Sequence, residues 1–443
     1  MGLQNNKYSN IKGIVDNNLC TSCGVCETIC PVGAISFKWT HDSKKPIIDF
    51  NKCTGCGSCY AVCPGKNIQF QDECKSQIEK EFGKVDTSFL FKKNENVVGK
   101  YVASAGFITS FFKYLFDTKQ IDGALVVSLK GHDMKDAKSS IIKGIDDLEQ
   151  IGGSIYCQVP LSESLKELER LEGKFAVVGL PCQIRGINNL IKRREDFKKK
   201  IVIKIGLFCG YMVGYSGMNY LLESLKIPKT KKIEKISFRA KKSTEDGFLV
   251  ETSDGDYFVS RGKYSALLNR SFSNRRCLMC NDMGAEFADI ACGDAHGFSG
   301  KQSLVLSRNK ESTSMIQDAI NKGYLSLNRS LSIGEAYASQ RLILKYKKGT
   351  IGARLRIMKW FNKVIPNYET GPLPRSNLFQ KIGSFFYILN CYINDTKLGR
   401  KIFFSFPDKM TIFFSHILTY FLSGRPFDVF SDIYKKLKKG DKH

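Results

Sequence analysis

Residues 20–37 read CTSCGVCETICPVGAISF, and residues 53–70 read CTGCGSCYAVCPGKNIQF. Every cysteine of the first stretch recurs 33 residues later in the second, as do its glycine between the second and third cysteine and its proline after the fourth. Each copy is therefore one Cys-x2-Cys-x2-Cys-x3-Cys-Pro run. The duplication sets residues from about 10 to 75 apart as one domain.

The spacing within each copy is that of bacterial ferredoxins, in which the fourth cysteine of one run ligates the cluster of the other run. Three thiolates two residues apart can wrap one face of a 4Fe–4S cubane, and the small Gly and Ser between them let backbone N–H groups reach the sulfurs. We therefore expect an α+β bacterial-ferredoxin-like domain with two 4Fe–4S clusters. A pair of zinc knuckles is the alternative, but zinc needs no duplicated frame of eight cysteines and two prolines. The expected ligand sets are Cys20, Cys23, Cys26 and Cys63 for one cluster, and Cys53, Cys56, Cys59 and Cys30 for the other.

Length and composition set the frame for the rest of the chain. With 443 residues and 42% apolar residues, the chain is long enough for two or three domains with ordinary cores. The opening residues, MGLQNNKYSN, lack the basic-then-apolar pattern of a signal peptide. A cytoplasmic location follows as an expectation, and there the 16 cysteines are expected to be metal ligands rather than disulfides.

The middle of the chain alternates short apolar runs with helical patterns. Residues 76–97 are polar and are interpreted as a helix plus a linker. Beyond them, strands separated by helices predict an α/β domain with a mixed or parallel sheet over residues 98–335, which we divide into 98–175 and 176–335. Asp254-Gly255 predicts a hairpin turn. The expected strands are 123–129, 174–180 and 201–208, with a helix over 162–172.

Two further pairs of cysteines predict a third metal site. Cys182 and Cys209 each follow a predicted strand, at the sheet edge where α/β proteins bind ligands. Cys277 and Cys280 form an isolated Cys-x-x-Cys pair that needs two more ligands. If the two strands are neighbours, the four thiolates can hold a third 4Fe–4S cluster. Zinc fits the same ligands, but a redox-inert ion would not extend the electron path of the first two clusters.

Several other residues have plain structural interpretations. Cys292 lies on an apolar strand and is interpreted as a buried small side chain, and Cys74 as a spare thiol. His132 is interpreted as incidental, whereas His296 is a weak candidate for proton delivery. Arg239 is either a surface ion-pair partner or a phosphate contact. No dinucleotide or P-loop fingerprint appears.

Five segments in order carry a resemblance to one known family. They include GSIYCQVPLSESLKELERLEGKFAVVGLPCQIRGI and CLMCNDMGAEFADIACGD. The chain resembles the coenzyme F420 hydrogenase/dehydrogenase beta-subunit family, which includes the plant 7-hydroxymethyl chlorophyll a reductase. The matching segments are 103–127, 153–187, 204–210, 236–241 and 277–294.

The resemblance implies a flavoprotein, with FAD beside one 4Fe–4S cluster held by the family's recurring cysteines. Here those match Cys182, Cys209, Cys277 and Cys280. Small residues in two of the segments expected at the flavin would let backbone N–H groups approach its phosphates. This chain has Ser-Ala-Gly where the family often has Ser-Gly-Gly. The flavin contacts that the resemblance implies are Ser104, Ala105 and Gly106, then Gly179, Pro181 and Gln183, and finally Gly293 and Asp294.

Together these features predict an iron–sulfur flavoprotein oxidoreductase, with no catalytic residue assigned. It would pass electrons between the ferredoxin-type clusters and FAD, and exchange a hydride with an organic substrate or deazaflavin coenzyme. The alternative is an electron-transfer subunit that serves a larger hydrogenase or dehydrogenase and has no substrate of its own. A redox partner protein fits either hypothesis. A nucleic-acid partner is not expected, because the net charge of +25 is concentrated in one aromatic tail and no nucleic-acid fold signature appears.

That tail, residues 336–443, carries 20 Lys and Arg against 6 Asp and Glu, together with 20 of the 51 aromatic residues. It is predicted to be a separate, basic, helical module. Its longest uncharged stretch, 410–424, is too short to span a bilayer, which takes about 20 residues. Two interpretations stay open. The tail either packs its aromatic residues on the α/β core or lies on the cytoplasmic face of a membrane as a peripheral anchor.

Overall fold

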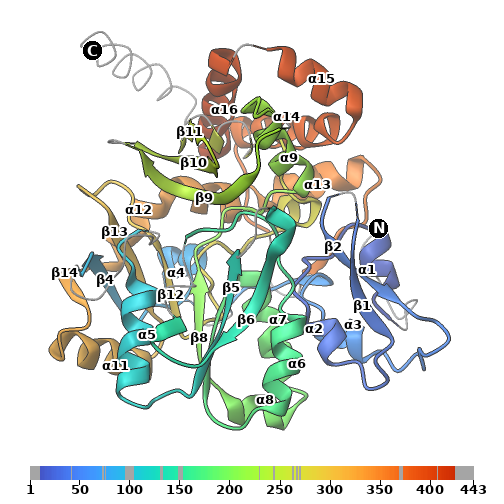
Figure 1. The fold of residues 1–443 in the computed structure, drawn as a ribbon. Helices are drawn as coiled ribbons and strands as arrows, with labels where there is room; N and C mark the ends of the chain where they lie inside the picture. Colours follow the sequence, from blue (N-terminus) through green and yellow to red (C-terminus); the bar gives the residue numbers. More distant parts are fainter. Residues whose placement is uncertain are drawn as a thin grey trace.

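A computed structural model of the chain shows a mixed α/β fold built around one large sheet (Figure 1). The mixed α/β class and large sheet are confirmed. The structure describes residues 10–40, 42–71, 74, 76–94, 104–129, 133–147, 153–228, 230–242, 245–261, 264–265, 268, 271–368, 373–406 and 408–424. His132 and residues 425–443 lie outside that set.

Eight strands form the large sheet in the order β14-β4-β13-β12-β8-β7-β5-β6. The central pairs β12/β8, β8/β7 and β7/β5 are parallel, and the outer pairs are antiparallel. The three expected strands correspond to β5, β7 and β8. The bounds are β4 Thr87–Lys92, β5 Gly123–Leu129, β6 Ala137–Ile142, β7 Phe175–Gly179, β8 Ile201–Leu207, β12 Ile290–Asp294, β13 Gln302–Ser307 and β14 Ser326–Leu331.

The prediction of a linker within residues 76–97 is wrong, because the strand β4 lies there and pairs with β13 and β14. Its residues Ser88 to Phe91 are all buried. Lysines and acidic residues flank this short apolar run, so the whole segment is interpreted as polar from the sequence. Before it, α4 (Gln77–Phe82) begins with a capping box between Ser76 and Glu79, so the expected helix is present.

Helices cover both faces of the large sheet, which is why its central strands are rich in buried aliphatic residues. Along β5, Leu125 packs in the core with α6 and α7, whereas Ala124 and Val126 pack in the core with α5 and α11. This alternation follows from the two-residue period of a strand. The helix bounds are α5 Phe107–Asp117, α6 Ser162–Arg170, α7 Pro181–Ile191, α8 Glu195–Lys200 and α11 Lys310–Asn321.

The cysteine-rich N-terminal module docks directly on α6 and α7 (Figure 1). Gly24 has a φ of +97°, and a Cβ there would lie 2.5 Å from the backbone nitrogen of Ser162. Only glycine allows this approach. The backbone N–H of Leu161 also donates to the carbonyl oxygen of Cys23 at 3.1 Å. The elements of the module are α1 Lys12–Asp16, α2 Val25–Thr28, β1 Ile35–Trp39, β2 Lys44–Ile48, α3 Ser58–Val62 and β3 Asn67–Ile68.

A separate three-stranded antiparallel sheet packs near α9 (Tyr215–Ser224) and consists of β9 (Ile233–Lys242), β10 (Glu245–Thr252) and β11 (Gly255–Ser260). Thr252 pairs with Gly255, so the predicted Asp254-Gly255 turn is confirmed. Shorter elements are the 3-10 helices η1 (Met134–Asp136) and η3 (Arg275–Met279).

The prediction of a separate tail module is wrong. Ile351, Leu355 and Ile388 belong to the same buried core as the N-terminal module and the large sheet. The strand β15 (Asn367–Tyr368) pairs with β3 of that module. Sequence composition did not reveal this because Lys347, Lys348 and Arg354 are buried rather than solvated. The tail elements are α12 Ile333–Leu344, the π-helical turn η4 Lys345–Gly349, α13 Ile351–Trp360, α14 Leu378–Asn394, α15 Lys397–Ser405 and α16 Asp408–Ser423. No helix in the described ranges is long and apolar enough to cross a bilayer.

Candidate functional site

The thiols expected to hold the first cluster lie together in the core. Burial raises the pKa of the Cys26 thiol, and the neighbouring thiols of Cys23, Cys20 and Cys63 raise it further. Burial and the charge of Cys20 likewise raise the pKa of Cys63 to about 12. Cys63 thus adjoins the first copy of the motif, as the crossed arrangement requires.

The thiols expected to hold the second cluster lie nearer the surface. Burial raises the pKa of Cys59, with smaller effects from Cys30 and Cys56. Cys56 is exposed, and a hydrogen bond with the Ser58 hydroxyl lowers its pKa. Cys30 and Cys53 are half-buried. The second group of thiols is therefore more exposed to solvent than the first.

The four remaining cysteines named as ligands meet at the edge of the large sheet. Cys182 is the second residue of α7, directly after β7, and Cys209 follows β8. Burial raises the pKa of Cys182 to about 12, and the charges of Cys277 and Cys280 add to it. Burial also raises the pKa of the Cys209 thiol, and the charges of Cys277, Cys182 and Cys280 raise it further, although Lys347 opposes the shift. Since β7 and β8 are neighbouring parallel strands, their carboxyl ends bring the two cysteines together.

Two buried cations accompany this four-cysteine group. Arg276 is 3% exposed and Lys347 is 1% exposed. Burial raises the pKa of the Cys280 thiol, but Lys347 and Arg276 outweigh burial and leave that pKa lowered. Burial in turn lowers the pKa of Lys347, yet the thiols of Cys280 and Cys209 reverse this and raise it. Fixed positive charge therefore stabilises thiolates at this group.

The three cysteine groups adjoin one another in order. Cys59 of the second set raises the pKa of Cys26 in the first set, after burial and the nearer thiols. Cys182 of the sheet-edge group likewise raises the pKa of Cys23. A Cβ on Gly186 of α7 would lie 3.4 Å from the Cys23 sulfur, which shows how closely α7 approaches the first set.

Arg276 joins the N-terminal module to the sheet-edge group. Its Nη2 and Nε donate to the carbonyl oxygens of Asn67 and Gly65 at 3.0 and 3.2 Å, and its Nη1 donates to that of Met279 at 2.6 Å. Gly65 lies two residues after Cys63, and Met279 lies between Cys277 and Cys280. The guanidinium therefore fixes the two ligand loops against each other.

Beside the sheet-edge group lies a cavity of about 510 Å³, within the usual range of about 300–1,000 Å³ for a ligand site. Cys209 lines it. Of the eight flavin contacts implied by the resemblance, Ala105 and Pro181 are not lining residues. The other six line it: Ser104, Gly106, Gly179, Gln183, Gly293 and Asp294.

One wall of the cavity is the N-terminal end of α5. Ser104 has a φ of +54°, and its hydroxyl donates to the carbonyl oxygen of Gln302 at 2.7 Å. The backbone N–H of Ala105 donates to Ser303 Oγ at 3.1 Å. This turn is thus held on β13, and the helix N-terminus beyond it offers backbone N–H groups to an anion.

Gln183 has a structural role, because both polar atoms of its side chain bond to the backbone of this chain. Its Oε1 accepts from the backbone N–H of Leu180 at 2.8 Å, and its Nε2 donates to the carbonyl oxygen of Val159 at 2.8 Å. These bonds begin α7 and attach it to the segment before α6. Gln183 therefore shapes the cavity wall.

Two arginines converge on Asp294, which pairs in the sheet with Ser303, the residue that holds the turn before α5. Arg239 Nη1 lies 2.8 Å from Asp294 Oδ1, and Arg261 Nη2 lies 3.0 Å from Oδ2. Burial raises the pKa of Asp294, but the two guanidinium groups outweigh burial and leave that pKa lowered. Arg239 Nε is buried and has no hydrogen-bond partner among the described residues. His296 also lines the cavity, and its partly desolvated surroundings lower the pKa of its imidazole.

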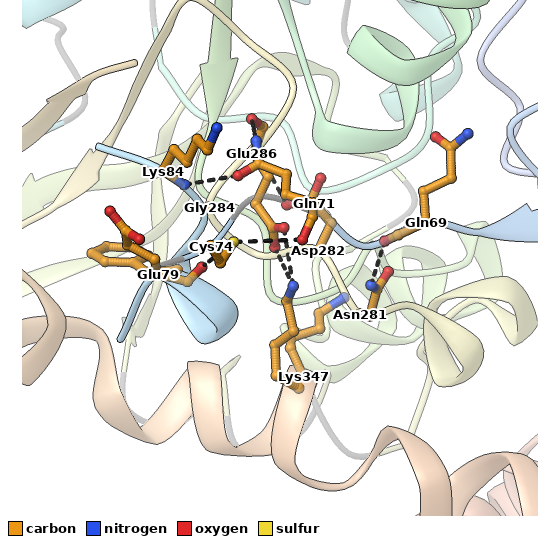
Figure 2. Close-up of polar contacts among 12 residues, drawn as sticks. Gln69, Gln71, Cys74, Glu79, Lys84, Asn281, Asp282, Gly284, Glu286 and Lys347 are labelled. Carbon is orange, nitrogen blue, oxygen red and sulfur yellow. Dashed lines mark hydrogen bonds and ion pairs between the residues drawn. The ribbon is translucent and has the colours of Figure 1, made fainter. Parts of the chain in front are cut away.

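A polar network fixes the chain after the N-terminal module to the loop beyond Cys280 (Figure 2). Gln71 Nε2 donates to the carbonyl oxygen of Glu286 at 2.6 Å, and Asn281 Nδ2 donates to that of Gln69 at 2.8 Å. Lys348 Nζ lies 2.8 Å from the Glu286 carboxylate. Burial raises the pKa of Glu286 to about 7, even though Lys348 opposes the shift.

The remaining cysteines have other surroundings. Cys292 lies on β12 and is 4% exposed, as expected, although it also contributes to the cavity wall. Cys74 is half-buried beside the start of α4 and lies outside the three groups. In the part of the chain that the structure describes, no three Cys, His, Asp or Glu side chains are grouped so that they could hold a single metal ion.

Three family models match the chain. Residues 19–81 match a 4Fe-4S dicluster domain. Residues 91–166 match the N-terminal part of the coenzyme F420 hydrogenase/dehydrogenase beta subunit, and residues 172–330 match its C-terminal part. The chain belongs to the coenzyme F420 hydrogenase/dehydrogenase beta-subunit family. The two beta-subunit matches contain all four sheet-edge cysteines and the residues that line the cavity, apart from Gln340 and Ile343.

Several proteins similar to this chain are named as oxidoreductases or as their subunits. One subunit of the F(420)H(2) dehydrogenase of Methanosarcina mazei is 26% identical over 67% of this chain and 81% of its own length. The coenzyme F420-dependent sulfite reductase of Methanocaldococcus jannaschii is 28% identical, again over 67% of this chain, but the chain spans only 45% of that protein. A chain of the F420-reducing [NiFe] hydrogenase complex of Methanosarcina barkeri shares the fold, with a TM-score of 0.51 and 21% identity over 65% of this chain and 97% of that one.

Sequence reasoning missed four basic residues of the site. Lys347 and Arg354 lie in the tail, whose composition predicts a separate module. Nothing in the run KYKKG distinguishes its buried lysines from solvated ones. Arg261 carries no motif. Arg276 adjoins Cys277, and that position is the one signal from which a role near the cysteines could have been inferred.

Proposed function

We propose that this protein is an iron–sulfur flavoprotein oxidoreductase that connects a one-electron partner protein with a two-electron substrate. Bound 4Fe–4S clusters supply one-electron transfer and bound FAD supplies hydride exchange with a deazaflavin coenzyme or another organic substrate. The observation that carries the proposal is the order of the site: an exposed cysteine group, a buried one, the sheet-edge group and then the cavity.

The donor chemistry fits three clusters. Each group offers four cysteines, namely Cys20, Cys23, Cys26 and Cys63 in the core, Cys53, Cys56, Cys59 and Cys30 nearer the surface, and Cys182, Cys209, Cys277 and Cys280 at the sheet edge. Lys347 and Arg276 offset the negative charge that four buried thiolates bring. Arg276 also keeps the first and third groups at a fixed separation.

The cavity fits a flavin nucleotide. The α5 N-terminus and the unpaired Arg239 Nε are donors for phosphate oxygens. The Asp294 carboxylate orients Arg239 and Arg261 through its two ion pairs. His296 can hold or release a proton at the cavity wall. Cys209 belongs to both the cluster group and the cavity wall, so it would bring the third cluster next to the flavin.

The second candidate is an electron-transfer subunit without its own substrate. The relatives favour it in part, since several are named as subunits of dehydrogenases or of a hydrogenase. A flavin lying flat against a partner would need little enclosed space. An enzyme would instead need space for an organic substrate over the flavin, in addition to the cavity assigned to FAD.

Cofactor analysis of anaerobically purified protein tests the proposal. Three cubanes predict about twelve irons and twelve sulfides per chain, and acid treatment should release FAD. Cys277→Ala should lose about four irons and leave the N-terminal pair intact. About eight irons with one zinc would make the sheet-edge group a zinc site, and a fully metallated protein without flavin would contradict the FAD assignment.

A further inference from the structure

The tail's last two helices differ in how much of their apolar surface is covered. α16 packs on α14: a Cβ at Gly383 would lie 2.7 Å from Phe421 Cβ, and Leu418 and Leu422 are buried. Tyr387 of α14 is buried in one cluster with Leu278 and with Leu422 of α16, so the expectation that tail aromatic residues pack on the core holds for this residue. Leu398 and Ile402 of α15 are instead exposed.

Three apolar residues of α15 and its C-cap face solvent. Leu398, Ile402 and Phe406 recur every four residues, so they lie along one side of the helix, and they are 68%, 50% and 48% exposed. We call these three residues the α15 stripe. The start of α16 adds Met410, Phe413 and Phe414, which are 54%, 49% and 37% exposed.

Such an uncovered stripe needs an occupant, because large apolar patches on soluble surfaces mark contacts with proteins or membranes. The charge of the same segment discriminates between them. Residues 397–410 contain Lys397, Arg400, Lys401 and Lys409 against one acid, Asp408. The cores of protein interfaces are depleted of lysine, whereas helices that lie on membranes combine apolar residues with lysine and arginine.

We infer that α15 and the start of α16 form a contact site for a bilayer surface that contains anionic lipids. Figure 1 shows these helices at one end of the molecule, on the side away from α8 and α11. The exposed Lys401 lies next to Ile402 of the stripe. Apolar side chains would enter the boundary between headgroups and acyl chains while the exposed Lys401 meets lipid phosphate.

The site lies outside both the cysteine groups and the cavity, and no residue of the stripe belongs to them. Membrane contact would therefore hold the protein at the bilayer without changing its cofactor content. The inference is independent of the proposed function and can fail separately from it.

Vesicle sedimentation with the full-length protein tests this site. Wild type should bind vesicles of phosphatidylglycerol and phosphatidylcholine at least about tenfold more tightly than pure phosphatidylcholine vesicles, and 0.5 M salt should weaken binding, because several cations contribute. The triple variant Leu398→Ser, Ile402→Ser and Phe406→Ser should bind the mixed vesicles at least about tenfold more weakly, since three apolar anchors are lost.

A matched control removes three apolar side chains of similar exposure elsewhere: Phe50→Ser, Val202→Ser and Leu342→Ser, at 61%, 41% and 51%. It should bind like wild type, and both variants should keep wild-type iron content and circular dichroism. Equal binding of wild type and the stripe variant, equal binding to neutral vesicles, or no binding at all would overturn the inference. A wild-type dimer that the stripe variant abolishes, without vesicle binding, would assign the stripe to a second copy of the chain.

Discussion

Arg354 donates a hydrogen bond from Nη2 to the carbonyl oxygen of Cys280 at 3.1 Å, although 74 positions separate the two residues. The same Nη2 reaches the carbonyl oxygen of Lys347 at 2.7 Å. This fully buried guanidinium therefore fixes the π-helical turn η4 against the Cys277–Cys280 loop. π-Helical turns often occur at functional sites, and this one places Lys347 beside the sheet-edge thiols.

Replacing Lys347 by Met should lower the reduction potential of the cluster proposed at the sheet edge. A unit charge about 6 Å away is worth roughly 3 kcal/mol at an effective dielectric constant of about 20, which corresponds to a shift on the order of 100 mV. An EPR-monitored redox titration measures it. Lys347→Arg keeps the charge and Lys359→Met removes an exposed lysine of α13, so both should retain the wild-type potential. An unchanged reduction potential in Lys347→Met would show that Lys347 does not raise the potential of this cluster.

Arg354→Lys keeps the charge but not the fork of donors that joins two segments. Buried carbonyl oxygens left without a donor cost about 1–3 kcal/mol each, so the sheet-edge group should loosen. We expect iron content to fall by about four per chain while the N-terminal clusters persist. Iron and sulfide analysis measures this. Arg356→Lys, an exposed position in the same helix, is the control, and full iron content in Arg354→Lys would contradict the prediction.

Arg239→Gln should weaken FAD binding by about 10- to 100-fold, because a charge-assisted hydrogen bond is worth about 1.5–3 kcal/mol. Fluorescence titration of flavin-depleted protein measures the dissociation constant. Iron content should not change, since Arg239 lies apart from the cysteine groups. Arg329→Gln removes a surface arginine that pairs with Glu335 and should bind FAD normally. A wild-type dissociation constant in Arg239→Gln would exclude the phosphate contact.

Glu286 predicts a pH dependence of stability. Its pKa rises from an unfolded value near 4.5 to about 7 when burial outweighs the attraction of Lys348. Between these values the folded state binds the extra proton, so the free energy of unfolding falls as pH rises, by up to about 1.4 kcal/mol per pH unit, and levels off above pH 7. The double variant Glu286→Gln and Lys348→Met removes the pair without leaving a buried charge alone.

Thermal unfolding under anaerobic conditions between pH 5.5 and 8 measures this dependence. The unfolding temperature of wild type relative to that of the double variant should fall as pH rises toward 7, and the difference should stay constant above it. Parallel curves across the whole range would show that Glu286 does not titrate in this window.

The sequence alone determined the parts that short-range chain geometry dictates. The two Cys-x2-Cys-x2-Cys-x3-Cys-Pro runs identified the dicluster domain because ligand spacing within ten residues constrains what the loop can bind. Runs rich in Val and Ile located β5, β7 and β8 for the same reason, and the ends of β7 and β8 pointed to Cys182 and Cys209.

Only the tertiary structure decided what surrounds those cysteines. The position of β4 inside the sheet, the docking of α7 against Cys23, and the burial of Lys347 and Arg354 beside Cys280 depend on contacts between residues far apart in the chain. Such contacts follow from how whole elements pack. A buried lysine and a solvated lysine look identical in the sequence, because what distinguishes them is the partner that the fold brings to each.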